Sequence, residues 1–247
     1  MNYDFCKFKN AINGSAAELF FYGDIVSDSW SAWKNEDQYP MNVRALLNEI
    51  GSNDIDIHIN SGGGNVFAGF AICNMLKSCT GYKRVYVDGL AASISSVIAM
   101  AGDEIIIPSN AFMMIHKASV GLRGNSDDLR TMADVLDKLD SGIAAVYMAK
   151  AAEGVNEDKI IELMTAETWL SGDETAELFS NIKTVEAVEA VASCDSKYMS
   201  EYSVPEAYAG LSCRDSGQPG ADCAGADDSA EKLAAYIAAV RAGFGIQ

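Results

Sequence analysis

The stretch from residue 55 to residue 115 alternates strand-like and helix-like apolar patterns, which restricts the fold more than any other feature of the sequence. Ile55, Ile57 and Ile59 are separated by single polar residues, as in a strand with one buried face. Three glycines follow, and then residues 66–76 have the composition of a buried helix. The order strand, helix, strand, helix, strand predicts right-handed crossovers and an α/β fold with a largely parallel sheet.

Other short apolar segments extend this pattern on both sides. Further strands are expected at residues 17–22, 83–88, 104–108 and 112–115. Further helices are expected at residues 42–50, 92–101, 156–164 and 171–179. Ser171 and Glu174 have the spacing of a capping box, so the last of these helices should begin at Ser171.

Residues 125–153 have a different pattern, with one long apolar stripe. Its members are spaced three or four residues apart: Leu129, Met132, Leu136, Leu139, Ile143 and Val146. At 1.5 Å per residue, such a helix would extend roughly 40 Å. A domain of this size does not need so long a helix to cover its own sheet. We therefore expect this helix to reach a neighbouring subunit in an oligomer, with a long helix that packs only within its own subunit as the alternative.

The C-terminal part of the chain changes composition. From about residue 193 to residue 229 it is rich in Ser, Gly, Asp, Cys and Pro and has no periodicity. The expected organisation is one α/β domain over 1–190, a linker or poorly ordered segment over 191–228, and a helical tail over 229–247.

Composition and charge argue against several classes of partner. The net charge of −17 opposes binding to nucleic acid. No apolar run approaches 18 residues and the first residues have no signal-peptide core, so we expect neither a membrane span nor export. Six cysteines without C-x-x-C spacing and two histidines predict reduced thiols, a cytoplasmic location and no metal site. Without a G-x-x-x-x-G-K-[ST] loop we expect no nucleotide, and no other cofactor is indicated.

Ser93 is the first candidate for chemistry, because it lies at a predicted strand-to-helix turn. A hydroxyl there lies at the positive end of a helix, and the next amide, that of Ile94, points to where an oxyanion would form. Serine is also a common helix N-cap, and Ser95 and Ser96 lie close by. The local pattern therefore does not by itself select Ser93 as a nucleophile.

Three glycines and two histidines complete the set of candidates. Glycines at 62–64 would let the backbone approach a ligand at the end of a parallel strand, although a plain tight turn explains them equally well. His116 follows an apolar strand and could act as a general base, while His58 lies on the polar face of a strand, where a structural or solvent-exposed role is expected. The sequence has many carboxylates, and residue types alone do not select one to orient an imidazole.

Four ordered motifs over roughly residues 17–190 resemble the Clp protease proteolytic subunit (ClpP) family, and more closely its phage-encoded relatives that act in head maturation. The motifs are INSGGG at 59–64, GLAASIS at 89–95, MMIHK at 113–117, and the stretch EGVNEDKIIELMTAETWLSGDETAELF at 153–179. The resemblance implies the ClpP/crotonase-like superfold of ββα repeats with a long protruding handle helix.

The same resemblance implies a serine endopeptidase that acts on proteins or peptides. Ser93 would be the nucleophile, His116 the base, and Glu167 the third member of the triad. The amides of Gly63 and Ile94 would form the oxyanion hole, and Gly64 would line the substrate strand. The resemblance also implies a ring homo-oligomer, heptameric or a double ring, with an AAA+ unfoldase or phage scaffold and capsid proteins as candidate partners. A phage-encoded enzyme would act in the host cytoplasm.

Two departures from the family pattern affect the site. Gly62 stands where the family usually has proline, and Glu167 stands where it has aspartate. Asp173, six residues further on, is the alternative acid. Three other functions stay open: a catalytically inactive scaffold or assembly protein, a signal-peptide-peptidase-A-like serine–lysine peptidase, and a relative of enoyl-CoA hydratase.

Overall fold

The computed structural model describes residues 8–9, 16–187, 194 and 196–204. Within these ranges the strands are β1 Phe8–Lys9, β2 Ala17–Phe21, β3 Ile55–Ser61, β4 Lys83–Ala92, β5 Glu104–Pro108, β6 Phe112–Ile115, β7 Thr168–Ser171 and β8 Ile182–Val185. The helices are α1 Pro40–Ile50, α2 Val66–Lys77, α3 Ile94–Ala99, α4 Ser126–Met148, α5 Glu157–Thr165, α6 Gly172–Leu178 and the 3₁₀ helix η1 Lys197–Glu201. The expected helical tail at 229–247 lies outside the described residues.

The strands form one mixed sheet in the order β1-β2-β3-β4-β5-β8, with β6 paired to β4 and β7 paired to β6. The pairs from β2 to β8 along this order are parallel, and β1 and β7 are added antiparallel to their neighbours. The α/β fold and the largely parallel sheet expected from the sequence are therefore confirmed.

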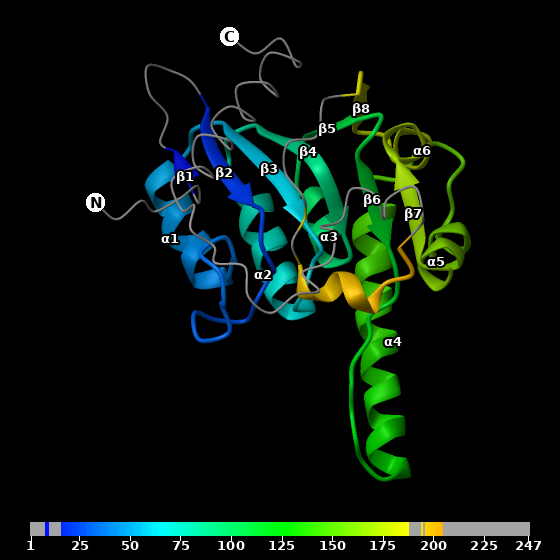
Figure 1. Cartoon of the computed structure of the whole chain (residues 1–247). Helices are drawn as coiled ribbons and strands as arrows, with labels where there is room; N and C mark the ends of the chain where they lie inside the picture. The colour runs from blue at the N-terminus through cyan, green and yellow to red at the C-terminus, as the bar shows by residue number, and fades with distance from the viewer. Residues whose placement is uncertain (1–7, 10–15, 188–193, 195, 205–247) are drawn as a thin grey trace, which may run out of the picture.

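The core lies between this sheet and the helices α1–α4 (Figure 1). The alternating isoleucines of β3 are fully buried in it, as the period-two pattern predicted. Helix α2 is capped by Asn65, whose side chain accepts a hydrogen bond from the amide of Ala68. This short turn between β3 and α2 fixes the glycine loop at the carboxyl edge of the sheet.

Two expected elements differ in length for identifiable reasons. Strand β4 continues past residue 88 to Ala92, because its last residues pair with β6. Helix α4 ends at Met148 rather than near 153 because the chain turns away, and the amide of Ala152 bonds to Leu178 O. Gly154, with φ of 89°, completes this turn in a conformation that favours glycine.

Helix α4 extends well beyond the body of the molecule (Figure 1). It begins with a capping box formed by Asn125 and Asp128. Leu129 in its first turns is half exposed, as are Val120 and Leu122 in the preceding segment. The long helix predicted from the sequence is thus confirmed. The side chains of its first, protruding half are exposed or only partly buried. No helix among the described residues is both long and apolar enough to cross a membrane.

Candidate active site

Ser93 lies between the end of β4 and the start of α3, in a strained backbone conformation. Its φ of 55° is in the left-handed region, which costs a non-glycine residue of order 1–3 kcal/mol unless the surroundings impose it. Here they do, because the amide of Ser93 donates to Met114 O at 2.9 Å and its carbonyl accepts from the amide of Ser96 at 3.0 Å. A sharp strand-to-helix turn of this kind exposes the serine hydroxyl.

The pairing of β4 with β6 brings His116 to this hydroxyl. Ala92 pairs with Met114, so the residues that follow both strands leave the sheet side by side. The Nε2 atom of His116 lies 2.7 Å from Oγ of Ser93. Burial lowers the pKa of His116, and the negative charges of Glu167, Asp140 and Glu201 act in the opposite direction. A neutral imidazole bonded to a serine hydroxyl can take its proton.

The pairing of β6 with β7 brings Glu167 to the same place. Ile115 pairs with Thr168, so His116 and Glu167 extend from neighbouring strand ends. Glu167 has φ of 49°, and Ser93 and Glu167 are the non-glycine residues with positive φ in the described part of the chain. Glu167 follows α5 at a position where glycine is usual. Strain of this kind is concentrated at functional sites.

The structure does not join Glu167 to His116 by a hydrogen bond among the residues it describes. Instead, Oε1 of Glu167 accepts a hydrogen bond from the amide of Ser203. The alternative acid, Asp173, is exposed in the first turn of α6 and is not among the charges that act on His116. Of the two acids considered, Glu167 is the one that lies near the imidazole.

The glycine loop lies directly against the turn at Ser93. Gly63 and Gly64 have φ of 96° and 143°, a region that disfavours side chains. A Cβ atom at Gly63 would lie 2.7 Å from Cβ of Ser93 and 3.2 Å from the amide nitrogen of Ile94. The amide of Gly63 donates to Oγ of Ser61 at 3.2 Å, the long end of the range for such a bond. Gly63 and the amide of Ile94, both expected to contribute to an oxyanion hole, therefore lie close to Ser93.

The neighbouring serines have structural partners. The hydroxyl of Ser95 donates within the turn, to Ala92 O at 2.7 Å or Ser61 O at 2.9 Å. The hydroxyl of Ser96 lies 2.7 Å from that of Tyr147, which links α3 to α4. Both serines are buried. These contacts leave Ser93 as the serine with access to the imidazole.

His58 has a structural environment far from Ser93. Its ring is stacked between Phe20 and Tyr86, with centroids 4.9 Å away on either side. Its Nδ1 atom lies 2.9 Å from Oδ2 of Asp88, which also accepts a hydrogen bond from Tyr22. His58 is buried, so the structural role expected for it is confirmed and the solvent-exposed alternative is wrong.

A segment that follows β8 in the chain covers the candidate site, which the sequence did not indicate. Residues 196–204 belong to the range expected as a linker, yet η1 lies across the carboxyl edge of the sheet (Figure 1). The ring of Tyr202 lies edge-on to that of His116, with centroids 5.2 Å apart, and its hydroxyl donates to Gly62 O at 2.8 Å. The linker was predicted from a composition rich in Ser, Gly, Asp, Cys and Pro without periodicity, and residues 196–204 are too few for a period to show.

The cavity beside Ser93 is small. Its volume is about 60 Å³, and Tyr198, Glu201 and Tyr202 of the covering segment form part of its wall. Pockets for small-molecule ligands are usually ~300–1,000 Å³. With the covering segment in place, the cavity at Ser93 is therefore several times smaller than a usual ligand pocket.

The fold and the site define a class: an α/β protein with a hydroxyl–imidazole pair and flanking backbone amides at the carboxyl edge of a parallel sheet. The Clp protease family model matches residues 25–179, more than half of the chain, and every site residue discussed above except those of the covering segment. The chain belongs to the Clp protease family.

Individual relatives agree with this assignment. The chain is 32% identical over 124 residues to an ATP-dependent Clp protease proteolytic subunit of Deinococcus radiodurans, covering 49% of this chain and 59% of the relative. It is 35% identical over 121 residues to proteolytic subunit 1 of Chlamydia abortus, covering 47% and 62%. The chain thus spans about three fifths of the length of these relatives.

A solved structure supports the fold. A point mutant of ClpP1 from Listeria monocytogenes matches with a TM-score of 0.56 at 22% identity, covering 68% of this chain and 91% of that chain. The expected ClpP-like superfold is confirmed.

Proposed function

We propose that this protein is a serine endopeptidase of the ClpP type, which hydrolyses peptide bonds inside a ring-shaped oligomer. The observation that carries the proposal is the 2.7 Å contact between Nε2 of His116 and Oγ of Ser93, beside the amides of Gly63 and Ile94. Membership of the Clp protease family supports the same reaction.

The proposed reaction is acyl transfer. His116 takes the proton of the Ser93 hydroxyl as Oγ attacks the peptide carbonyl carbon, and the amides of Gly63 and Ile94 stabilise the oxyanion. The imidazolium then gives its proton to the leaving amine, and the C–N bond breaks. Water, deprotonated by the same imidazole, hydrolyses the acyl-enzyme. Glu167 would stabilise the imidazolium once its carboxylate is released from Ser203.

Covalent labelling and peptide cleavage test this proposal together. A fluorophosphonate should label the full-length protein, and labelling should be lost in Ser93→Ala and reduced in His116→Ala. Ser78→Ala is the matched control, because Ser78 is an exposed serine at the end of α2. Cleavage of a fluorogenic peptide should follow the same order. Labelling that persists in Ser93→Ala would overturn the assignment of the nucleophile.

The proposed oligomer rests on the protruding half of α4. The exposed apolar side chains of Leu129, Val120 and Leu122 lie on this part of the molecule, where another subunit could bury them. Native mass spectrometry should give a heptamer or a double ring, and Leu129→Asp should give smaller species. The family resemblance makes an AAA+ unfoldase, or phage scaffold and capsid proteins in the host cytoplasm, the partners to test.

A catalytically inactive scaffold is the second candidate, and the bond between Glu167 and Ser203 favours it, since the third catalytic residue is engaged elsewhere. Absence of turnover and of labelling in a correctly assembled oligomer would support this candidate.

The serine–lysine alternative has less support, because no lysine is among the described residues that line the cavity at Ser93. Lys117, next to His116, instead pairs with Asp140 at 3.5 Å. A hydratase would not need the hydroxyl of Ser93.

A further inference from the structure

We infer that Cys194 and residues 196–204 form an autoinhibitory cover, a segment of the chain that occupies the peptide-binding cleft and must move before substrate can reach Ser93. The inference rests on the proposed peptidase function and adds a mode of regulation to it. Three sets of contacts carry it: polar anchors at one end, an apolar patch beneath, and an aromatic ring over the catalytic pair.

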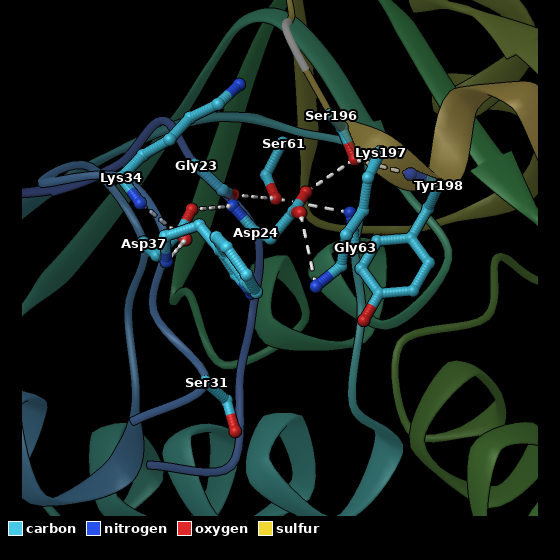
Figure 2. Close-up of polar contacts among 12 residues, drawn as sticks. Gly23, Asp24, Ser31, Lys34, Asp37, Ser61, Gly63, Ser196, Lys197 and Tyr198 are labelled. Carbon is cyan, nitrogen blue, oxygen red and sulfur yellow. Dashed lines mark hydrogen bonds and ion pairs between the residues drawn. The ribbon is translucent and has the colours of Figure 1, made fainter. Parts of the chain in front are cut away.

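The polar anchor is at Asp24, which is buried and follows shortly after the end of β2. The hydroxyl of Ser196 donates to Oδ1 of Asp24 at 2.5 Å, and Nζ of Lys197 lies 3.9 Å from Oδ2 (Figure 2). Burial raises the pKa of Asp24, while the hydrogen bond from Ser196 acts in the opposite direction. The cover therefore supplies the partners of a carboxylate that would otherwise lie buried beside Asp37.

The apolar part of the cover packs on the face of the sheet opposite the main core. Cys194 is buried there together with Leu90, Ala92 and Met114 of β4 and β6. Met199, Tyr202 and Val204 are partly buried against the same cluster, as are Phe112 and Trp169. These contacts remove apolar surface from water. The apolar side chains of the cluster would be exposed to water if the segment were released.

The third set of contacts blocks the chemistry. The ring of Tyr202 lies against His116, and its centroid is 6.5 Å from that of Trp169. Burial raises the pKa of the Tyr202 hydroxyl, and a hydrogen bond with Ser93 acts in the opposite direction. With Ser203 bonded to Glu167 as well, the cover contacts all three members of the proposed triad.

Gly62 is what allows the cover to lie so close. A Cβ atom at this position would lie 2.6 Å from Cβ of Ser196 and closer still to its hydroxyl, so any other residue would displace the segment. The φ of Gly62 is outside the left-handed region, so its own backbone does not require glycine. The absence of a side chain at Gly62 thus serves the packing of the cover.

The first test measures the cover without reference to catalysis. In hydrogen–deuterium exchange of the full chain, the peptide containing residues 196–204 should be protected in the wild type. It should lose protection in Gly62→Ala and in Tyr202→Ala. Tyr82→Ala is the matched control, since Tyr82 is a half-exposed tyrosine at the opposite edge of the sheet, just before β4. Exchange of residues 196–204 at the rate of an unstructured peptide in the wild type would overturn the inference.

The second test measures access to Ser93. A cover that is closed nine-tenths of the time lowers an observed rate about tenfold. Fluorophosphonate labelling should therefore be about tenfold or more faster in Tyr202→Ala and Gly62→Ala than in the wild type and in Tyr82→Ala. Equal labelling rates in all four proteins would overturn the cover and leave the proposed peptidase standing. Failure of all four to label, with the exchange pattern as expected, would overturn the peptidase and leave the cover standing.

Discussion

The amide of Ser203 donates a hydrogen bond to Oε1 of Glu167, the carboxylate that we propose for orienting His116. One bond therefore couples the covering segment to the third member of the triad. While it holds, the imidazole has its hydroxyl partner, Ser93, but no bonded acid among the described residues. Release of the segment would free the carboxylate and open the cleft in a single step.

The choice of acid can be tested by comparing two carboxylates. Glu167→Gln should lower kcat by about 100-fold or more, because the amide cannot stabilise the imidazolium. Asp173→Asn should leave kcat unchanged, since Asp173 is exposed on α6. Steady-state cleavage of a fluorogenic peptide measures both. Loss of activity in Asp173→Asn with little change in Glu167→Gln would transfer the role to Asp173.

The acid limb of the pH profile should report His116. Burial lowers its pKa from the ordinary value of 6.5, and the neutral imidazole is the form that accepts the serine proton. The value of kcat/KM should therefore decrease as the pH is lowered, with a midpoint below pH 6.5. In Glu167→Gln, a charge that favours the imidazolium is lost, so the midpoint should move to lower pH. A midpoint that moves upward in this variant would contradict the electrostatic role of Glu167.

The turn at Gly63 can be separated from general backbone strain. Gly63→Ala would place a methyl group against Cβ of Ser93, whereas Gly154→Ala, at nearly the same φ, would meet nothing within 4 Å. Gly154→Ala should be destabilised by about 1–2 kcal/mol, the usual cost of a left-handed alanine, and Gly63→Ala by more, because its methyl group also meets Ser93. We expect Gly63→Ala alone to lose activity, by about 100-fold, since the oxyanion donor and the nucleophile move together. Urea unfolding and peptide cleavage measure the two effects. Equal activity in the two variants would remove Gly63 from the proposed site.

The sequence was sufficient for the elements with strong periodicity and insufficient for the relationships between strand ends. The isoleucines of β3 and the stripe of α4 identified their structures, because burial of one face imposes a period. Strand β7 was missed because only Leu170 of its four residues is buried, so it has no apolar run of the kind that marked β6. Yet the pairing of Thr168 with Ile115 is what places Glu167 beside His116. Such pairings depend on contacts between residues that are far apart in the sequence, and a local sequence pattern does not contain this information.

The covering segment shows the same difficulty at larger sequence separation. Ser196 of this segment donates a hydrogen bond to Asp24, 172 residues earlier in the chain. Nothing in the composition of the segment distinguishes it from a linker. The family resemblance proposed Ser93 and His116 from their motifs, and the structure brings them together. It ended near residue 190, so it gave no information about what lies over them.

The link between α3 and α4 provides a last prediction. The hydroxyl of Tyr147 lies 2.7 Å from that of Ser96, whose own hydroxyl also donates to Ser93 O in the strained turn. Tyr147 is fully buried, and burial raises the pKa of its hydroxyl. Tyr147→Phe keeps the ring and removes one buried hydrogen bond. We expect a loss of about 1 kcal/mol in the free energy of unfolding, measured by urea titration. We also expect a smaller kcat with unchanged KM, because Ser96 is freed to rotate and the turn that holds Ser93 loosens.

Phe179→Leu is the control, since it changes the neighbouring ring contact and leaves the hydroxyl chain intact. A change in kcat of the same size in Phe179→Leu would show that packing around Tyr147, rather than its hydrogen bond, positions the nucleophile.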